Sequence, residues 1–137
     1  MKAKEQHILF LSSTDSLNYF PHNHACDFQV ELSDSLHLRG NWTCALAQIS
    51  FNEKIIEDLV ILCDMCDESY IRDRRMPVLR VIPSQGPKQF IFESPFRLRV
   101  SRDELKRFRV YIRTLNFEIP SFVSGSVKCT LHLRCES

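Results

Sequence analysis

Cys63 and Cys66, separated by two residues, have the spacing in this sequence that is most typical of a chemical site. Upstream, His22, His24 and Cys26 add side chains of the types that zinc prefers. If that upstream segment is extended, its three side chains share one face, but in a continuous strand Cys63 and Cys66 point to opposite faces. A single Cys-x-x-Cys pair is weak evidence for a metal. We predict no metal site and no cofactor, and a zinc-stabilised binder or small metal-dependent enzyme remains our third hypothesis.

The six cysteines and five histidines do not by themselves indicate an enzyme. A cysteine nucleophile needs a histidine base within hydrogen-bond reach and usually a third group that orients the base. No segment has the pattern of a nucleophile elbow or of a metalloprotease helix. The glycines at positions 40, 86 and 125 are too scattered to form a phosphate-binding loop. We therefore predict no catalytic residues and no enzymatic activity.

The even number of cysteines would suggest disulfide bonds in a secreted protein. The amino-terminal residues, however, contain an apolar run that is too short for a signal peptide, and no small-residue cleavage site follows it. The longest apolar runs, residues 8–11 and 59–63, are also far shorter than the roughly 20 residues that a membrane span needs. We expect a protein that is neither secreted nor membrane-spanning, with reduced thiols at Cys26, Cys44, Cys63, Cys66, Cys129 and Cys135.

Most of the chain has the residue pattern of β-strands, and these strands must position any functional side chain. Residues 26–32 show the pattern clearly, because Phe28, Val30 and Leu32 alternate with polar residues. Pro95 interrupts another such segment, which is typical of an edge strand or a bulge. The sequence predicts eight strands, at residues 7–12, 26–32, 42–51, 59–66, 78–82, 89–100 with the break at Pro95, 107–113 and 126–134.

Some segments of the chain do not follow a simple strand pattern. Residues 52–58 are expected to form a short helix or a loop, and residues 67–75 an exposed charged loop. Ser101, followed three residues later by Glu104, matches a helix capping box, which predicts one helical turn at residues 102–106. The strand at 42–51 changes its apolar parity near Ala45, so it is either buried on both faces or bulged.

The length and composition are those of one globular domain. The chain has 137 residues, of which 44% are hydrophobic and 26% charged, and this mixture excludes disordered and collagen-like proteins. Eight strands with almost no helix predict an all-β, antiparallel sandwich or jelly roll that covers residues 1–137.

The net charge is only +1, but the charges are unevenly distributed along the chain. Residues 1–71 carry four basic and eleven acidic groups, whereas residues 72–113 carry twelve basic and four acidic groups. This asymmetry suits subunits that pair an acidic with a basic surface, or a face turned toward nucleic acid. Alternatively, strands from the two parts interleave and their charges neutralise one another locally.

Five arginines occupy outward-facing positions in two predicted strands that are adjacent in sequence. If those strands pair as a hairpin, the arginines form one basic sheet face that can hold phosphates or an acidic partner. The alternative is that the arginines simply solvate an exposed sheet. The candidate partner or nucleic-acid face consists of Arg97, Arg99, Arg107, Arg109 and Arg113.

Two parts of the sequence resemble a known protein family. The first combines Asn-Tyr-Phe-Pro at residues 18–21, the alternating segment 28–32, and a Leu-x-Gly-x-Trp motif at 38–42 that leads into a further strand. The second is the closing segment 125–134. Together they resemble the penton-type minor capsid proteins of Polinton (Maverick) elements and adintoviruses. The resemblance implies a single jelly roll that forms homopentamers at the vertices of an icosahedral double-stranded DNA virus capsid.

Our leading hypothesis from the sequence is therefore a viral structural protein, a small capsid subunit located in the virion. We expect it to assemble in the host nucleus or cytoplasm, to form a homopentamer and to contact the major capsid protein. Contact with nucleic acid through the arginine face stays open. The alternative is a β-sandwich protein-interaction adaptor, derived from the host or from a mobile element, without catalytic activity.

Overall fold

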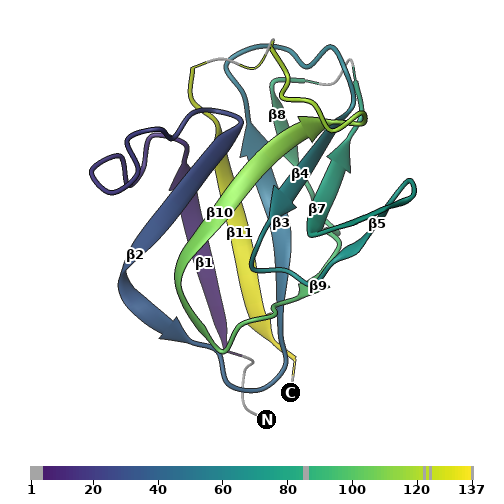
Figure 1. Cartoon of the computed structure of the whole chain (residues 1–137). Coiled ribbons are helices and arrows are strands. Elements are labelled where there is room, and N and C mark those ends of the chain that lie inside the picture. Colours follow the sequence, from purple (N-terminus) through teal and green to yellow (C-terminus); the bar gives the residue numbers. More distant parts are fainter. Residues whose placement is uncertain (1–4, 85–86, 122, 124, 137) are drawn as a thin grey trace.

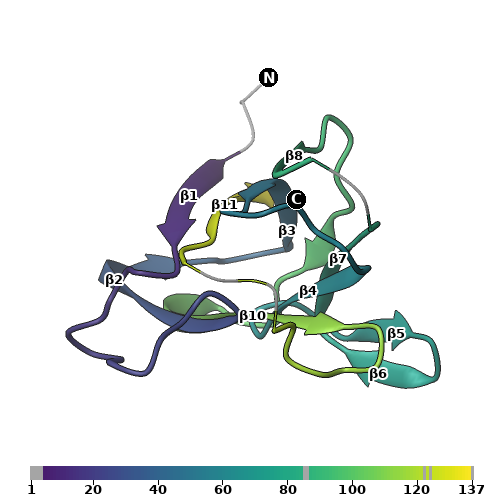
Figure 2. The same ribbon diagram turned by 90° about the horizontal axis from the view of Figure 1, so that it is seen from above.

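The computed structural model describes residues 5–84, 87–121, 123 and 125–136. These residues form an all-β domain in which two antiparallel sheets pack against each other, and they contain no helix. Figure 1 shows the two layers and Figure 2 shows them from above. The predicted all-β class and antiparallel arrangement are confirmed. The described part of the chain also contains no helix that is long and apolar enough to cross a membrane.

We call the two layers sheet A and sheet B. Sheet A has the order β1-β11-β3-β8, and the short strand β9 also pairs with β3; these are β1 (Gln6–Ser12), β11 (Lys128–Cys135), β3 (Trp42–Ser50), β8 (Gln89–Ile91) and β9 (Leu98–Arg99). Sheet B has the order β2-β10-β4-β7, formed by β2 (Asp27–His37), β10 (Glu104–Thr114), β4 (Leu59–Cys63) and β7 (Val78–Ile82). A separate hairpin joins β5 (Ser69–Ile71) to β6 (Arg74–Met76).

The core lies between the sheets and follows the period-two alternation of the strands. On β10, Phe108, Val110 and Ile112 are buried, and the residues between them point outward. Sheet A contributes Leu46 and Leu131, which lie opposite each other in the β3–β11 ladder and are fully buried. Each such side chain contributes about 1.5–3 kcal/mol by leaving water.

A bulge in β3 explains why the apolar pattern of that strand changes its parity near Ala45. Gln48 pairs with Thr130, but the next residue of β11, Leu131, pairs with Leu46, so Ala47 is the extra residue. The Ala47 carbonyl accepts a hydrogen bond of 2.9 Å from the Phe92 N–H group. The bulge lets residues on both sides of Ala47 point into the same core.

The number of strands differs from the predicted eight. The segment broken at Pro95 is divided into β8 and β9, both of which pair with β3. The charged loop predicted at residues 67–75 contains the β5–β6 hairpin, whose turn includes Arg72 with a positive φ of 55°. Eleven strands are therefore present in the described residues, and nine of them build the two sheets.

The predicted helical turn at residues 102–106 is wrong. β10 begins at Glu104, because Leu105 pairs with Leu36 of β2 and its side chain is fully buried. The Leu38 N–H group also donates to the Asp103 carbonyl at 2.7 Å, which extends the strand contact to residue 103. Pairing with β2 therefore prevails over the local capping pattern. Residues 52–58 form a loop, anchored by the buried side chain of Ile55.

The core predicts the effect of truncating Leu131. Leu131→Ala should lower the free energy of unfolding by about 2–5 kcal/mol, because it leaves a cavity between two packed sheets. Urea denaturation followed by the fluorescence of Trp42, which is buried, measures the change. The control Ile56→Ala alters a side chain that is 64% exposed and should change stability by less than about 0.5 kcal/mol. Equal effects of the two variants would contradict this assignment of the core.

Candidate functional site

The five arginines predicted to share one sheet face lie on two different sheets. Arg99 belongs to β9, and Arg97 directly precedes that strand, so both are on sheet A. Arg107, Arg109 and Arg113 belong to β10 in sheet B. The hairpin between the two segments does not form, because β9 pairs with β3 and β10 pairs with β2 and β4. The predicted single arginine face is therefore wrong.

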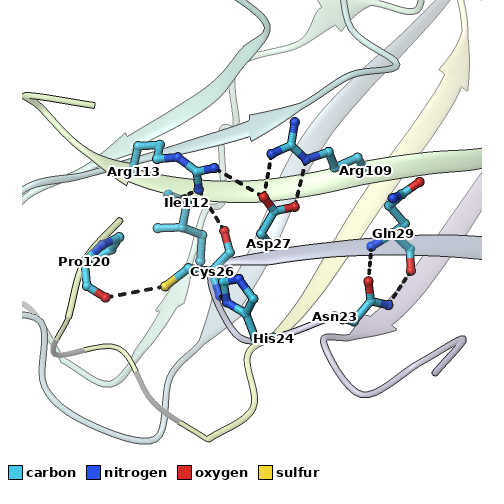
Figure 3. A network of polar contacts seen from close by, with 9 residues as sticks. All are labelled: Asn23, His24, Cys26, Asp27, Gln29, Arg109, Ile112, Arg113 and Pro120. Carbon is cyan, nitrogen blue, oxygen red and sulfur yellow. Dashed lines mark hydrogen bonds and ion pairs between the residues drawn. The ribbon is translucent and has the colours of Figure 1, made fainter. Parts of the chain in front are cut away.

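Asp27 is the centre of a polar network on the outer face of sheet B (Figure 3). Arg109 donates from Nε to Asp27 Oδ1 at 2.7 Å, and Arg113 donates from Nη2 to Asp27 Oδ2 at 3.2 Å. Arg113 also donates from Nη1 to the Cys26 carbonyl at 3.1 Å. The Tyr111 ring lies between these arginines, with the Cζ atoms of Arg109 and Arg113 at 4.1 and 5.2 Å from its centroid. One carboxylate thus holds two guanidinium groups across the β2–β10 contact.

The electrostatics of Asp27 agree with this geometry. Burial raises the pKa of Asp27, but the hydrogen bonds and positive charges of Arg109 and Arg113 outweigh burial and hold that pKa below its ordinary value. The hydrogen bond that Arg109 donates to Asp27 correspondingly raises the pKa of Arg109. Asp27 and Arg109 are therefore charged at neutral pH.

The other ion pairs of this region also join a carboxylate from early in the chain to an arginine from later in the chain. Arg107 binds Glu31, Arg102 lies 3.2 Å from Asp64, and Arg75 lies 3.9 Å from Glu68. In every one of these pairs, as in the Asp27 network, the carboxylate comes from residues 1–71 and the arginine from residues 72–113. The two charged parts of the chain interleave and neutralise each other locally, which favours the simpler of our two interpretations of the charge asymmetry.

A groove borders this network on the side of the loop between β1 and β2. Its volume is about 580 Å³, and its walls include Tyr19, Phe20, Gln29 and Arg109. Asn23 fixes the loop, because its side chain donates to the Gln29 carbonyl at 2.8 Å and accepts from the Gln29 N–H group at 2.9 Å. The loop is therefore a positioned element that presents Tyr19 to solvent.

Arg97 lies in a second polar network, on the outer face of sheet A. It donates to Thr43 Oγ1 at 2.8 Å and to the His132 carbonyl at 3.1 Å, and it lies 3.6 Å from Glu136. Its Nη1 atom is 3.1 Å from His132 Nδ1, which must accept this hydrogen bond, since arginine is only a donor. Burial, followed by the charges of Arg97 and Arg134, lowers the pKa of His132.

Apolar side chains are also exposed on the outer face of sheet A. Phe10 on β1 and Ile91 on β8 are at the two ends of one row across the sheet, with Thr130 and Gln48 between them. Phe10 is 78% exposed and Ile91 is 69% exposed. A groove of about 460 Å³ lies along this row beside Phe10. Sequence alternation indicates the outward parity of Phe10, but it does not show which outward residues lie next to each other across the sheet.

The cysteines are part of the core, where burial suppresses their reactivity. Cys26, Cys44, Cys63, Cys66 and Cys129 are free thiols, and all five are buried. Burial raises the pKa of Cys26 to about 11 and that of Cys129 to about 12, and it also raises the pKa of Cys63. Cys66 lies beyond the end of β4, and hydrogen bonding to Cys44 is the main cause that raises its pKa.

The zinc ligands considered from the sequence do not meet. Cys63 and Cys66 are buried in the core, whereas His22 and His24 line the groove beside the β1–β2 loop. In the parts of the chain that the structure describes, no group of three or more His, Cys, Asp or Glu side chains is placed to hold a metal ion.

The Asp27 network predicts a loss of stability in Asp27→Asn. The variant should unfold with a free energy lower by about 1–2 kcal/mol at pH 7, because two arginines lose their charged acceptor and the site is partly exposed to solvent. The depressed pKa stabilises the fold above the unfolded-state pKa of about 3.9, and this stabilisation is lost as the pH falls through the folded-state value. Urea denaturation at pH 7 and pH 3 measures both effects. The control Glu68→Gln, in an exposed pair, should change stability by less than about 0.5 kcal/mol; an equal loss would contradict the role of Asp27.

His132 predicts a second dependence on pH. Because its folded-state pKa is lowered, the unfolded chain binds a proton first as the pH falls below about 6.5, and the folded protein becomes less stable. His132→Gln should therefore lose less stability than the wild type between about pH 7.5 and pH 5. Thermal unfolding at both values checks this expectation. Parallel curves for the two proteins would show that His132 does not carry the effect.

No protein-family model matches the chain, and no curated protein matches it in sequence.

Proposed function

We propose that this protein is a capsid subunit, a small penton-type minor capsid protein of a double-stranded DNA virus or virus-like element. In this proposal the domain is a single jelly roll that assembles with copies of itself and contacts the major capsid protein. The observation that carries the proposal is the order in which the strands pair.

The strand pairs are nested along the chain. β1 pairs with β11, β2 with β10, β3 with β8 and β9, and β4 with β7. The chain thus resembles one long antiparallel hairpin that is folded over. Its successive strand pairs belong alternately to sheet A and sheet B. A five-stranded and a four-stranded antiparallel layer linked in this way support the jelly roll of our proposal, an architecture common in viral capsids. The nested order supports the proposed fold family independently of the sequence resemblance.

Two separate apolar patches support assembly of several copies. Leu17 and Tyr19, in the loop between β1 and β2, are 42% and 64% exposed, whereas Ile91 and Phe96, on and after β8, are 69% and 68% exposed. The loop and β8 lie on opposite sides of the sandwich in both ribbon views (Figures 1 and 2). Different patches on opposite sides favour a head-to-tail contact, and such contacts form a ring when the rotation between successive copies closes.

The mass of the native assembly tests this proposal. Native mass spectrometry should give a particle whose mass is five times that of one chain or a multiple of it, and the particle should bind the major capsid protein of the same virus or element. Tyr19→Asp and Phe96→Asp should each shift the population to smaller species, because a charge is placed in an apolar contact. The control Tyr70→Asp, on the separate β5–β6 hairpin, should leave the assembly intact.

A strictly monomeric wild-type protein that never enters particles would rule out the capsid role. A monomer that instead binds one cellular protein through the groove beside Tyr19 would support the adaptor function.

A further inference from the structure

β1 is an edge strand of sheet A whose outer backbone groups are open. It pairs with β11 on one side only. Hydrogen bonds from the Cys135 N–H group to the Glu5 carbonyl and from the Ser13 N–H group to the Val127 carbonyl fix the pattern of this antiparallel ladder. Because hydrogen-bonded pairs alternate along such a ladder, residues with odd numbers face β11. Those with even numbers turn their N–H and C=O groups to the free edge.

Three residues of this free edge have no hydrogen-bond partner for their backbone groups within the described chain. Ser12 is satisfied, since its N–H group donates to Asp15 Oδ2 at 2.8 Å and its carbonyl accepts from the Asp15 N–H group at 2.9 Å. Gln6, Ile8 and Phe10 remain. Their side chains also point outward, and Ile8 and Phe10 are 50% and 78% exposed. The edge therefore offers backbone donors and acceptors beside apolar side chains.

The usual devices that protect a sheet edge are missing from β1. Proteins block open edges with charged residues, prolines or bulges. The ladder from Gln6 to Ser12 runs without a register shift, and its outward residues are uncharged and include no proline. β2, the neighbouring edge strand of sheet B, carries Asp27 and Glu31, which are ion-paired with arginines of β10, and also Asp34, so charged side chains protect this edge. Of these two edges, only β1 suits pairing with its own copy.

We propose that β1 pairs with β1 of a second copy of this chain, antiparallel, around a two-fold axis through Ile8. Ile8 then lies opposite Ile8, and Gln6 of each copy lies opposite Phe10 of the other. Each of these three residue pairs exchanges two backbone hydrogen bonds, so all six free N–H groups of the two edges are satisfied. The edge is neutral and self-complementary, as a two-fold contact requires. This inference does not depend on the proposed capsid role.

A charge-swap experiment tests the contact at the two-fold axis. The Tyr19→Asp, Phe96→Asp background removes the ring contacts proposed above, so pairing at β1 is measured as a monomer–dimer equilibrium by sedimentation velocity. Ile8→Lys should weaken dimerisation at least tenfold, a change of about 1.4 kcal/mol, because two like charges then face each other. An equimolar mixture of Ile8→Lys and Ile8→Glu should restore the dimer. The control Ile56→Lys, in the exposed loop after β3, should dimerise like its parent.

Amide hydrogen exchange tests the backbone bonds directly. The amides of Gln6, Ile8 and Phe10 should exchange freely in dilute protein and become protected as the concentration rises through the dimerisation range. The amides of His7, Leu9 and Leu11, which face β11, should be protected at all concentrations. Ile8→Pro should abolish the dimer and preserve the fold, since this N–H group takes no part in the β1–β11 ladder.

Clear results would overturn the proposal. The proposal is wrong if the background variant stays monomeric at millimolar concentration, or if Ile8→Lys and Ile56→Lys weaken dimerisation equally. It is also wrong if the exchange of the outward amides does not depend on protein concentration. A five-fold ring without pairing at β1 would leave the capsid role standing, and pairing at β1 without a ring would remove the capsid role alone.

Discussion

The alternation of side chains along β10 is the constraint on which the rest of this structure depends. β10 pairs with β2 on one side and with β4 on the other, so its backbone connects three strands of sheet B. Its inward residues fill the core, and its outward residues bind the carboxylates of neighbouring segments. A shift of the register by one residue would exchange these two sets, burying arginines and exposing Phe108 and Val110. The hydrophobic core and the polar network therefore fix the same register.

The alternation of side chains also explains which features could be predicted from the sequence. Each long strand has its own alternating pattern, so the all-β class and the positions of the main strands followed from local information. The bulge at Ala47 could be located only to within a few residues, since parity shows that a residue is extra but not which one. The β5–β6 hairpin was missed because Ser69–Ile71 and Arg74–Met76 are short and charged. The helical turn was wrong because Leu105 gains more from pairing and burial against β2 than from a local cap.

The candidate site was harder to predict, because it depends on which strands become neighbours. Arg97 and Arg107 are ten residues apart in the sequence, yet they lie on different sheets. Asp27 and Arg113 are far apart in the sequence and form an ion pair at 3.2 Å. Outward parity is a local property of one strand, whereas a surface is made by several strands. The charge asymmetry along the chain suggested a basic face, but the nested pairing of early with late strands places acidic segments beside basic ones.

The burial of the cysteines has a consequence for how this domain can be observed. Five thiols from both sheets are shielded from solvent, and the pKa values of Cys26, Cys63, Cys66 and Cys129 are raised, so few thiolates are exposed to a reagent in the folded state. Alkylation of these residues requires a local or global opening of the sandwich. Because the thiols are distributed over the core, from Cys26 beside β2 to Cys129 in β11, the rate at which each one is labelled reports how often its part of the domain opens. The labelling rates of these cysteines can therefore report the order in which the two sheets separate.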